Sequence, residues 1–363
     1  MTKKEVVFLL GAGAVKEAGL PTAVDLQETV EKDIAEKYPS LLPALRFVSG
    51  AIQFGKACKA EPDTSKVNIE DLLIACTFLA SRNKSHTYPF VSSWHELVSL
   101  LQPLPKEIKS DEASDTFQFL GSYCKNGLRD WLAIKEPHLL KYLRSFKDFI
   151  DAEYRLRIFT LNYDECIEHT LQDILGPINS RWTTGFNEQG WKPELLACDD
   201  FDAYVYKLHG SLDWINDPKL RICSVKWPPA QDSEELPSDF EPLFIFGTNA
   251  KLQSVDPYLT LLFRFQQTLN SGNVLVIIGY SFTDAHINAM ILEALQRDPQ
   301  MRCIIAHRDS TPKDLLPPDF EKMVAVEERF IHVKSFAKDA FESNELLNKV
   351  QEVFTLHEEE LPF

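Results

Sequence analysis

Three short apolar runs in this chain each end in a group of small or polar residues. Val6–Leu10 is followed by Gly11-Ala12-Gly13-Ala14, Ile158-Phe159 by Thr160-Leu161-Asn162-Tyr163-Asp164, and Tyr204–Leu208 by His209-Gly210-Ser211. In an open parallel α/β sheet, ligands bind in the crevice outside the carboxyl ends of the strands. A glycine turn, an Asn-x-Asp and a histidine at three such ends therefore indicate a nucleotide site with chemistry beside it.

The glycine turns allow two interpretations. The dinucleotide fingerprint has a third glycine three residues after the second, but here the next glycine after Gly13 is Gly19. Gly11 and Gly13 form either a tight strand-to-helix turn or a turn that lets the backbone approach a pyrophosphate. The run Val274–Ile278 leads into a second such turn, Gly279-Tyr280-Ser281. That turn indicates either phosphate or ribose contact, or a buried strand that ends in a hydroxyl turn.

The polar residues also have structural alternatives. Asn162 and Asp164 are both preferred helix N-caps, and we expect one of them to cap the helix predicted over 165–175. A single histidine at a strand end, such as His209, is more often a hydrogen-bonded structural residue than a catalyst. His286 lies in a predicted helix without similar companions, and we assign it no catalytic role.

The composition is that of a soluble globular protein, with 363 residues of which 44% are hydrophobic and 25% charged. A net charge of -16 without a basic stripe argues against nucleic-acid binding. Seven scattered cysteines without a Cys-x-x-Cys pair predict reduced thiols in a cytoplasmic protein and no zinc site. No segment approaches the ~20 apolar residues of a membrane span, and Glu5 makes the first apolar run a buried strand rather than a signal peptide.

The apolar spacing predicts an α/β fold, a Rossmann-like parallel sheet covered by helices, with a helical insertion after the first βα unit. We expect further strands over 156–160, 203–207, 243–246, 274–278, 302–306 and 329–333, and helices over 166–175, 257–270 and 284–297. Residues 39–150 read as helices punctuated by proline. The sheet domain is therefore expected to comprise 1–38 and 151–340, and 341–363 a C-terminal helix with an acidic tail.

Together these segments resemble the sirtuin superfamily, and especially its bacterial sirtuin-like defence branch. The matching segments are Gly11–Ala14 with Ala18-Gly19-Leu20-Pro21, Thr160–Asp164, Leu208–Ser211, and Gly279–Phe282 with Asp284 and His286-Ile287. The resemblance implies a sheet that binds NAD through Gly11, Ala12, Gly13, Ala14, Gly19, Pro21, Thr160, Gly279, Tyr280 and Ser281. It also implies Asn162 and His209 at the nicotinamide–ribose bond, with Asp164 orienting the ribose or Asn162.

The chain departs from the sirtuin deacylases in ways that affect the acceptor. Only Cys223 and Cys303 lie beyond His209, so their four-cysteine zinc module is missing and we expect no metal site. Val15 and Thr22-Ala23-Val24 replace the serine and the Asp-Phe-Arg of the family. We therefore expect water as the acceptor and predict an NAD glycohydrolase that releases nicotinamide and ADP-ribose. A protein deacylase and a non-catalytic NAD or ADP-ribose sensor are the alternatives.

The resemblance to the defence branch further implies NAD depletion in abortive infection by phage. An unregulated NAD hydrolase would poison its host, so the activity needs a control. Because the expected fold uses nearly the whole chain, we expect that control from homo-oligomerisation and a separately encoded partner, such as a HerA-type ATPase.

Overall fold

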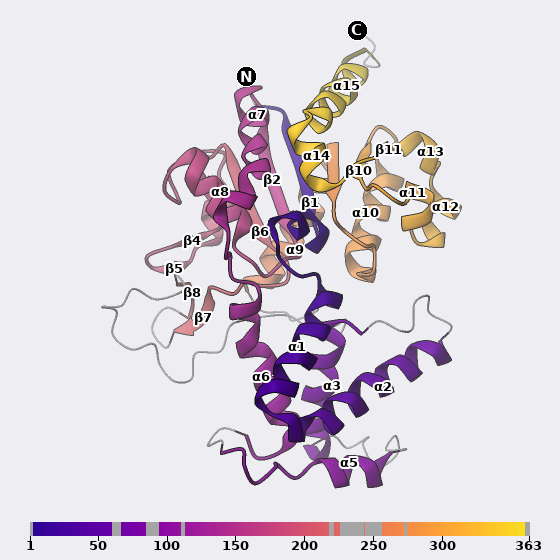
Figure 1. The fold of residues 1–363 in the computed structure, drawn as a ribbon. Helices are drawn as coiled ribbons and strands as arrows, with labels where there is room; N and C mark the ends of the chain where they lie inside the picture. The colour runs from indigo at the N-terminus through magenta and orange to yellow at the C-terminus, as the bar shows by residue number, and fades with distance from the viewer. Residues whose placement is uncertain are drawn as a thin grey trace. The chain divides into compact units, whose positions relative to one another are not determined.

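A computed structural model describes residues 3–59, 67–84, 94–109, 113–217, 221–225, 243, 256–271 and 274–359. The chain divides into two compact units, a sheet unit (1–20 and 134–363) and a helical unit (21–133). Both are drawn in Figure 1. The helical part was predicted over residues 39–150. In the structure the first long helix, α1 (Ala23–Lys37), belongs to the helical unit, and residues 134–150 belong to the sheet unit.

The sheet unit is built on seven parallel strands in the order β11-β10-β9-β1-β2-β6-β3. These strands are β1 (Glu5–Leu10), β2 (Arg155–Thr160), β3 (Trp182–Thr183), β6 (Ala203–Lys207), β9 (Val274–Ile278), β10 (Cys303–Ala306) and β11 (Phe330–Val333). Leu10 aligns with both Thr160 and Ile278, so the carboxyl ends of the central strands meet at one edge. The predicted Rossmann-like α/β fold is confirmed. The strand predicted over 243–246 falls, except for Leu243, outside the described residues.

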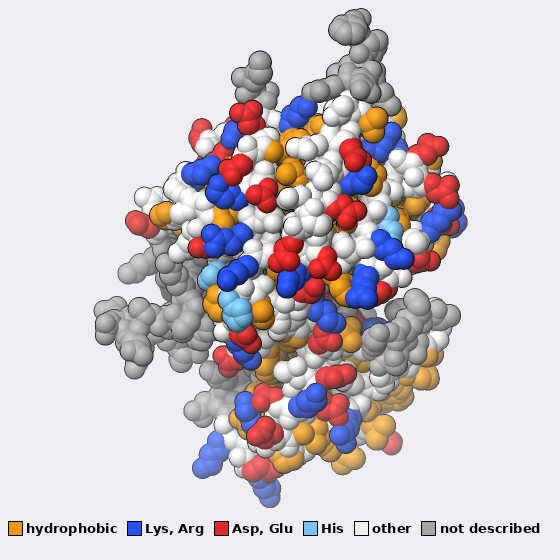
Figure 2. Space-filling model, turned by 45° about the horizontal axis from the view of Figure 1, so that its top comes forward, with side chains coloured by type: hydrophobic (Ala, Val, Ile, Leu, Met, Phe, Trp, Pro, Cys, Tyr) orange, Lys and Arg blue, Asp and Glu red, His pale blue; other side chains and the backbone are white. Residues whose placement is uncertain are grey.

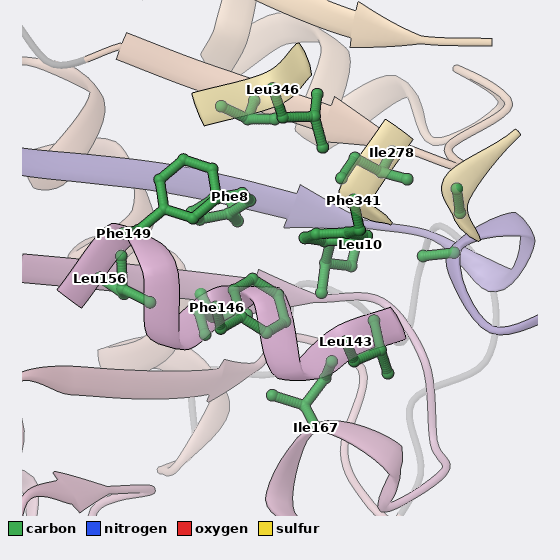
Figure 3. Packing of buried hydrophobic residues seen from close by; sticks show 14 of the residues in the cluster. Phe8, Leu10, Leu143, Phe146, Phe149, Leu156, Ile167, Ile278, Phe341 and Leu346 are labelled. Carbon is green, nitrogen blue, oxygen red and sulfur yellow. The ribbon is translucent and has the colours of Figure 1, made fainter. Parts of the chain in front are cut away.

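Helices cover both faces of this sheet, as expected for parallel strands that are buried on both sides. On one face are η5 (Pro137–Ser145), α7 (Phe146–Asp151), α8 (Cys166–Leu175), α14 (Ala337–Glu342) and α15 (Glu345–Glu359). On the other are α9 (Tyr258–Leu269), α10 (Ala285–Arg297) and α12 (Pro318–Met323). In the first core, Phe8 of β1 meets the rings of Phe146 and Phe149 edge-on, at 5.1 and 5.2 Å between centroids (Figure 3).

Shorter elements complete the sheet unit. They are the antiparallel pairs β4 (Phe186–Asn187) with β5 (Gly190–Trp191) and β7 (Trp214–Asp217) with β8 (Arg221–Ser224), and the helices α11 (Pro312–Leu315) and α13 (Val326–Arg329). On the face drawn in Figure 2, acidic and basic side chains are interspersed.

The helical unit contains α1, α2 (Leu42–Cys58), α3 (Ile69–Ser81), α5 (His95–Leu101) and α6 (Thr116–Trp131). Side-chain caps begin three of them, because Thr22, Asn68 and Asp115 each accept a backbone N–H of the first turn. The described residues of this unit include no strand, as predicted. Across the described ranges, no helix combines the length and the apolar character needed to cross a lipid bilayer.

Candidate active site at the carboxyl edge of the sheet

The two glycine turns meet at the boundary between β1 and β9. The chain continues from β1 to β2 on one side and from β9 to β10 on the other, so this boundary is the topological switch point of the sheet. The Gly11 N–H donates to the carbonyl of Ile278 at 3.0 Å, and the Gly13 N–H donates to the carbonyl of Gly279 at 3.0 Å. The turns are therefore joined backbone to backbone.

This contact explains why the turns are glycines. A Cβ on Gly11 would lie 2.4 Å from the Gly279 carbonyl oxygen, and a Cβ on Gly279 would lie 2.0 Å from the Ala14 nitrogen. Gly279 also has φ +65°, in the left-handed region that favours glycine. The structure thus supports the tight-turn interpretation of Gly11 and Gly13, and it shows why Gly279 is also a glycine. Their approach to a pyrophosphate stays a prediction.

Asn162 joins the end of β2 to the end of β1. Its Nδ2 donates to the Gly11 carbonyl at 3.2 Å, and its backbone N–H donates to Thr160 Oγ1 at 3.0 Å. Both Asn162 and Thr160 are buried. The Thr160 hydroxyl therefore fixes the turn that presents Asn162, and the amide of Asn162 has a set orientation against the first glycine turn.

The N-cap residue of α8 is Glu165, which makes no side-chain capping bond, so neither Asn162 nor Asp164 occupies the predicted N-cap position. Asp164 lies one residue earlier, and its Oδ1 accepts the N–H of Cys166, the first residue of α8, at 3.0 Å. Asn162 makes its side-chain contact to Gly11 instead. The predicted orientation of a ribose, or of Asn162, by Asp164 stays a prediction.

His209 is paired with a residue to which the sequence analysis gave no role. Its Nε2 lies 3.0 Å from Oδ2 of Asp284, and only 6% of His209 and 7% of Asp284 are exposed. β6 and β9 are separated by β1 and β2, three strand spacings or roughly 14 Å. The segments that follow β6 and β9 therefore reach toward each other across the ends of the two central strands.

The other predicted binding residues are placed as follows. Tyr280 is buried in the second core, and its hydroxyl lies 2.8 Å from Asn288 Oδ1, so this side chain is committed to the protein interior. Ser281 is exposed.

Ala12 and Ala14 form the short helix η1 (Ala12–Ala14), and the carbonyl of Ala14 accepts the Tyr142 hydroxyl at 2.6 Å. Gly19 has φ +85° at the end of η2 (Lys16–Ala18), and Pro21 belongs to the helical unit.

Comparison with known proteins shows what this site resembles. Residues 156–333 match the family model described as a SIR2-like domain, so this part of the chain is similar to that domain. The matched range runs from β2 to β11 and includes Asn162, His209 and Asp284. The matched range does not include β1 or the first glycine turn, which precede it in the chain.

A curated relative is "NAD(+) hydrolase ThsA" of Bacillus cereus (strain MSX-D12), 23% identical over 253 residues, which are 66% of this chain and 44% of the relative. The chain therefore spans less than half the length of that relative. Two solved structures are also similar. A Sir2 homologue in complex with NAD is 15% identical, with a TM-score of 0.43, and 96% of this chain and 90% of that one are covered. A mutant Sir2 homologue in complex with ADP ribose is 14% identical, with a TM-score of 0.43 and coverages of 98% and 94%.

A buried lysine supports the Asn162 loop. Lys207 is 1% exposed, and its Nζ donates to the carbonyls of Tyr163, at 3.3 Å, and of Asp164. Its Nζ also lies 3.1 Å from Glu168 Oε1. Burial lowers the pKa of Lys207, but the carboxylates around it, led by Glu168, raise it above its usual value, so the ammonium is retained.

Several carboxyl groups surround the Lys207 ammonium, which can neutralise only one of them. They are those of Glu168, Asp213, Asp164 and Glu165. Burial, followed by the neighbouring Asp213 and Glu168, raises the pKa of Glu165 to about 8. Burial also raises the pKa of Glu168. A proton is therefore held in this cluster near neutral pH.

Neither Lys207 nor the role of Asp284 was predicted from the sequence. A signal for Lys207 existed, because it is the one charged residue in the run Tyr204–Leu208. Asp284 lies in one of the segments that carry the family resemblance, but no local pattern pairs it with His209.

The cysteines do not form a metal centre. All seven are free, and Cys58 alone is exposed. No group of three or more His, Cys, Asp or Glu side chains arranged to hold a metal ion occurs among the residues that the structure describes.

Proposed function

We propose that this chain is an NAD glycohydrolase, which uses water to cleave the nicotinamide–ribose bond and gives nicotinamide and ADP-ribose. The observation that carries the proposal is the position of Asn162 and His209 at adjacent strand ends, beside paired glycine turns at the switch point of the sheet. The match to a SIR2-like domain and the relative named as an NAD(+) hydrolase support NAD as the substrate.

The leaving group of this reaction needs no protonation. The nicotinamide ring of NAD carries a positive charge, so it leaves as a neutral molecule with the bonding electron pair and needs no acid. Asn162 does not titrate, and its Nδ2 is held by Gly11, which leaves its amide oxygen to accept from a water or a ribose hydroxyl.

His209 serves as general base in this proposal. A water proton passes to the imidazole while the water oxygen bonds to the anomeric carbon and the carbon–nitrogen bond breaks. One proton is released for each NAD cleaved. Such a base contributes about 10²–10⁴ in rate.

The test is incubation with NAD, with and without an acetylated peptide, followed by analysis of all products. We expect nicotinamide and ADP-ribose at the same rate in both samples. Formation of O-acetyl-ADP-ribose that depends on the peptide would identify a deacylase, and binding without turnover would identify a sensor.

Two variants test the assigned roles within the same assay. His209→Ala and Asn162→Ala are expected to fold and bind NAD, and to release nicotinamide about 10²–10⁴ times more slowly. Wild-type hydrolysis by a folded His209→Ala protein would remove the general-base assignment.

The biological role that we propose is NAD depletion in antiphage abortive infection, controlled by homo-oligomerisation and a separately encoded partner such as a HerA-type ATPase. Apolar side chains exposed on the helical unit support an assembly role, with Phe54 59%, Leu97 50% and Leu100 75% exposed. Light scattering and co-purification with candidate partners test this role. A fully active, unregulated monomer would contradict it.

A further inference from the structure

We propose that Asp284 is a positioning residue that holds His209 in one tautomer, with its proton on Nε2 and its lone pair on Nδ1. The contact that carries this inference is the 3.0 Å approach of His209 Nε2 to Asp284 Oδ2, between two buried side chains. An ionised carboxylate only accepts hydrogen bonds, so the nitrogen that faces it must be the donor. The catalytic consequence rests on the proposed function, whereas the tautomer does not.

The carboxylate is held from its other side. Asp284 Oδ1 accepts the N–H groups of His286, at 3.0 Å, and Ile287, at 3.4 Å, at the start of the 13-residue helix α10. The N-terminus of a helix stabilises a negative charge. Asp284 is thus fixed by one oxygen, and its second oxygen is directed at His209.

The loop that carries Asp284 is braced by buried polar contacts. Asn288 Nδ2 donates to the carbonyl of Phe282 at 2.7 Å, and Phe282 has φ +55°, in the left-handed region. The Tyr280 hydroxyl lies 2.8 Å from Asn288 Oδ1 and 3.1 Å from the Asp284 carbonyl. Burial raises the pKa of Tyr280, so this hydroxyl remains a donor. Such bracing orients catalytic side chains in enzymes generally.

The tautomer decides which nitrogen of His209 can accept a proton during the reaction. With its proton on Nε2, His209 has its lone pair on Nδ1, which is a buried atom. A proton taken up there makes the ring an imidazolium. That cation forms against the Asp284 carboxylate, which stabilises it without accepting the proton itself. A histidine in the opposite tautomer would present an N–H where a lone pair is needed.

The decisive variant is Asp284→Asn. Asparagine is as good an N-cap as aspartate, so the start of α10 is preserved. Its amide oxygen can keep the backbone bonds while its NH₂ donates to His209 Nε2, which forces the imidazole proton onto Nδ1. Asp298→Asn is the matched control, because Asp298 Oδ1 accepts the Gln300 N–H at 2.8 Å beyond the opposite end of the same helix.

Two readouts apply, namely ¹⁵N NMR of the imidazoles at a pH where His209 is neutral, and kcat and KM for nicotinamide release. We expect the wild type and Asp298→Asn to show the Nε2–H tautomer of His209. Asp284→Asn should show the Nδ1–H tautomer and lose about 10²–10⁴ in kcat with little change in KM.

Each contrary outcome is informative. A wild-type Nδ1–H tautomer, or an unchanged tautomer in Asp284→Asn, would overturn the inference. A tautomer switch without a fall in kcat would overturn the catalytic part of it. If the wild type releases no nicotinamide and the tautomer still depends on Asp284, the proposed function fails and the positioning assignment holds.

Discussion

The ends of β1 and β9 and the ends of β2 and β6 lie on one edge of the sheet, but different forces hold them. The first pair is joined through glycine backbone, with Gly279 so close to Ala14 that no Cβ fits. The second pair is joined through buried charge, centred on Lys207. One half of the candidate site is therefore held by close backbone packing, and the other half by charge pairing. Substitutions in the two halves should therefore fail for different reasons.

The largest effect is expected for Gly279→Ala. The new Cβ would lie 2.0 Å from a backbone nitrogen at a residue with φ +65°, so both turns must move. We expect a loss of unfolding free energy of about 3 kcal/mol or more, or no soluble protein. The control is Gly50→Ala, within α2, where nothing lies within 4 Å of the added Cβ. That change should be neutral or stabilise by up to about 1 kcal/mol. Equal stability of the two variants in urea unfolding would show that close backbone packing does not hold the ends of β1 and β9.

The second effect tests the charged half through Lys207→Met. Removal of the ammonium leaves Glu168 and two backbone carbonyls buried without their partner. We expect a loss of about 3–5 kcal/mol. Lys147→Met is the matched control, because Lys147 makes an exposed ion pair with Asp151 at 2.7 Å and should lose less than about 1 kcal/mol. A loss for Lys207→Met no larger than that of the control would show that buried charge does not hold this half.

The third effect concerns pH and Glu165. Its pKa is about 8 in the folded protein, against 4.5 ordinarily, so the folded state binds this proton more tightly than the unfolded chain does. Its contribution to stability is therefore fully present below pH 4.5 and is lost as the pH rises to about 8. In Glu165→Gln this loss is absent, so the stability of the variant relative to the wild type should rise across that window. Parallel pH profiles in thermal unfolding would contradict the assigned proton.

The smallest effect is expected for Asp164→Asn. Asparagine retains the bond to the Cys166 N–H, so the start of α8 is kept and the unfolding free energy should change by less than about 0.5 kcal/mol. A larger loss in urea unfolding would show that the Asp164 charge itself balances Lys207, which would enlarge the charged half of the site.

Much of the fold could be predicted because β9 and β10, and β1 after Glu5, are continuous apolar runs. The predicted strand over 203–207 and helix over 166–175 agree with the structure at both ends. The two-residue strand β3 is too short to leave such a pattern. Helical spacing of apolar residues also predicted a helix at α5, but Leu97 and Leu100 are exposed there. This exposure could not be predicted, because spacing does not reveal whether another element covers the apolar face of a helix.

The chemical groups that follow the strands could be read from the amino-acid sequence: glycine after β1 and β9, asparagine after β2, histidine after β6. Local apolar patterns suffice for that, since each motif follows its own strand. Their partners became known only from the three-dimensional fold. Asp284 reaches His209 across 75 residues of chain and two intervening strands, and Gly279 meets Gly13 through their backbones. Strand order sets such contacts, and strand order follows from the packing of the whole sheet rather than from any single segment.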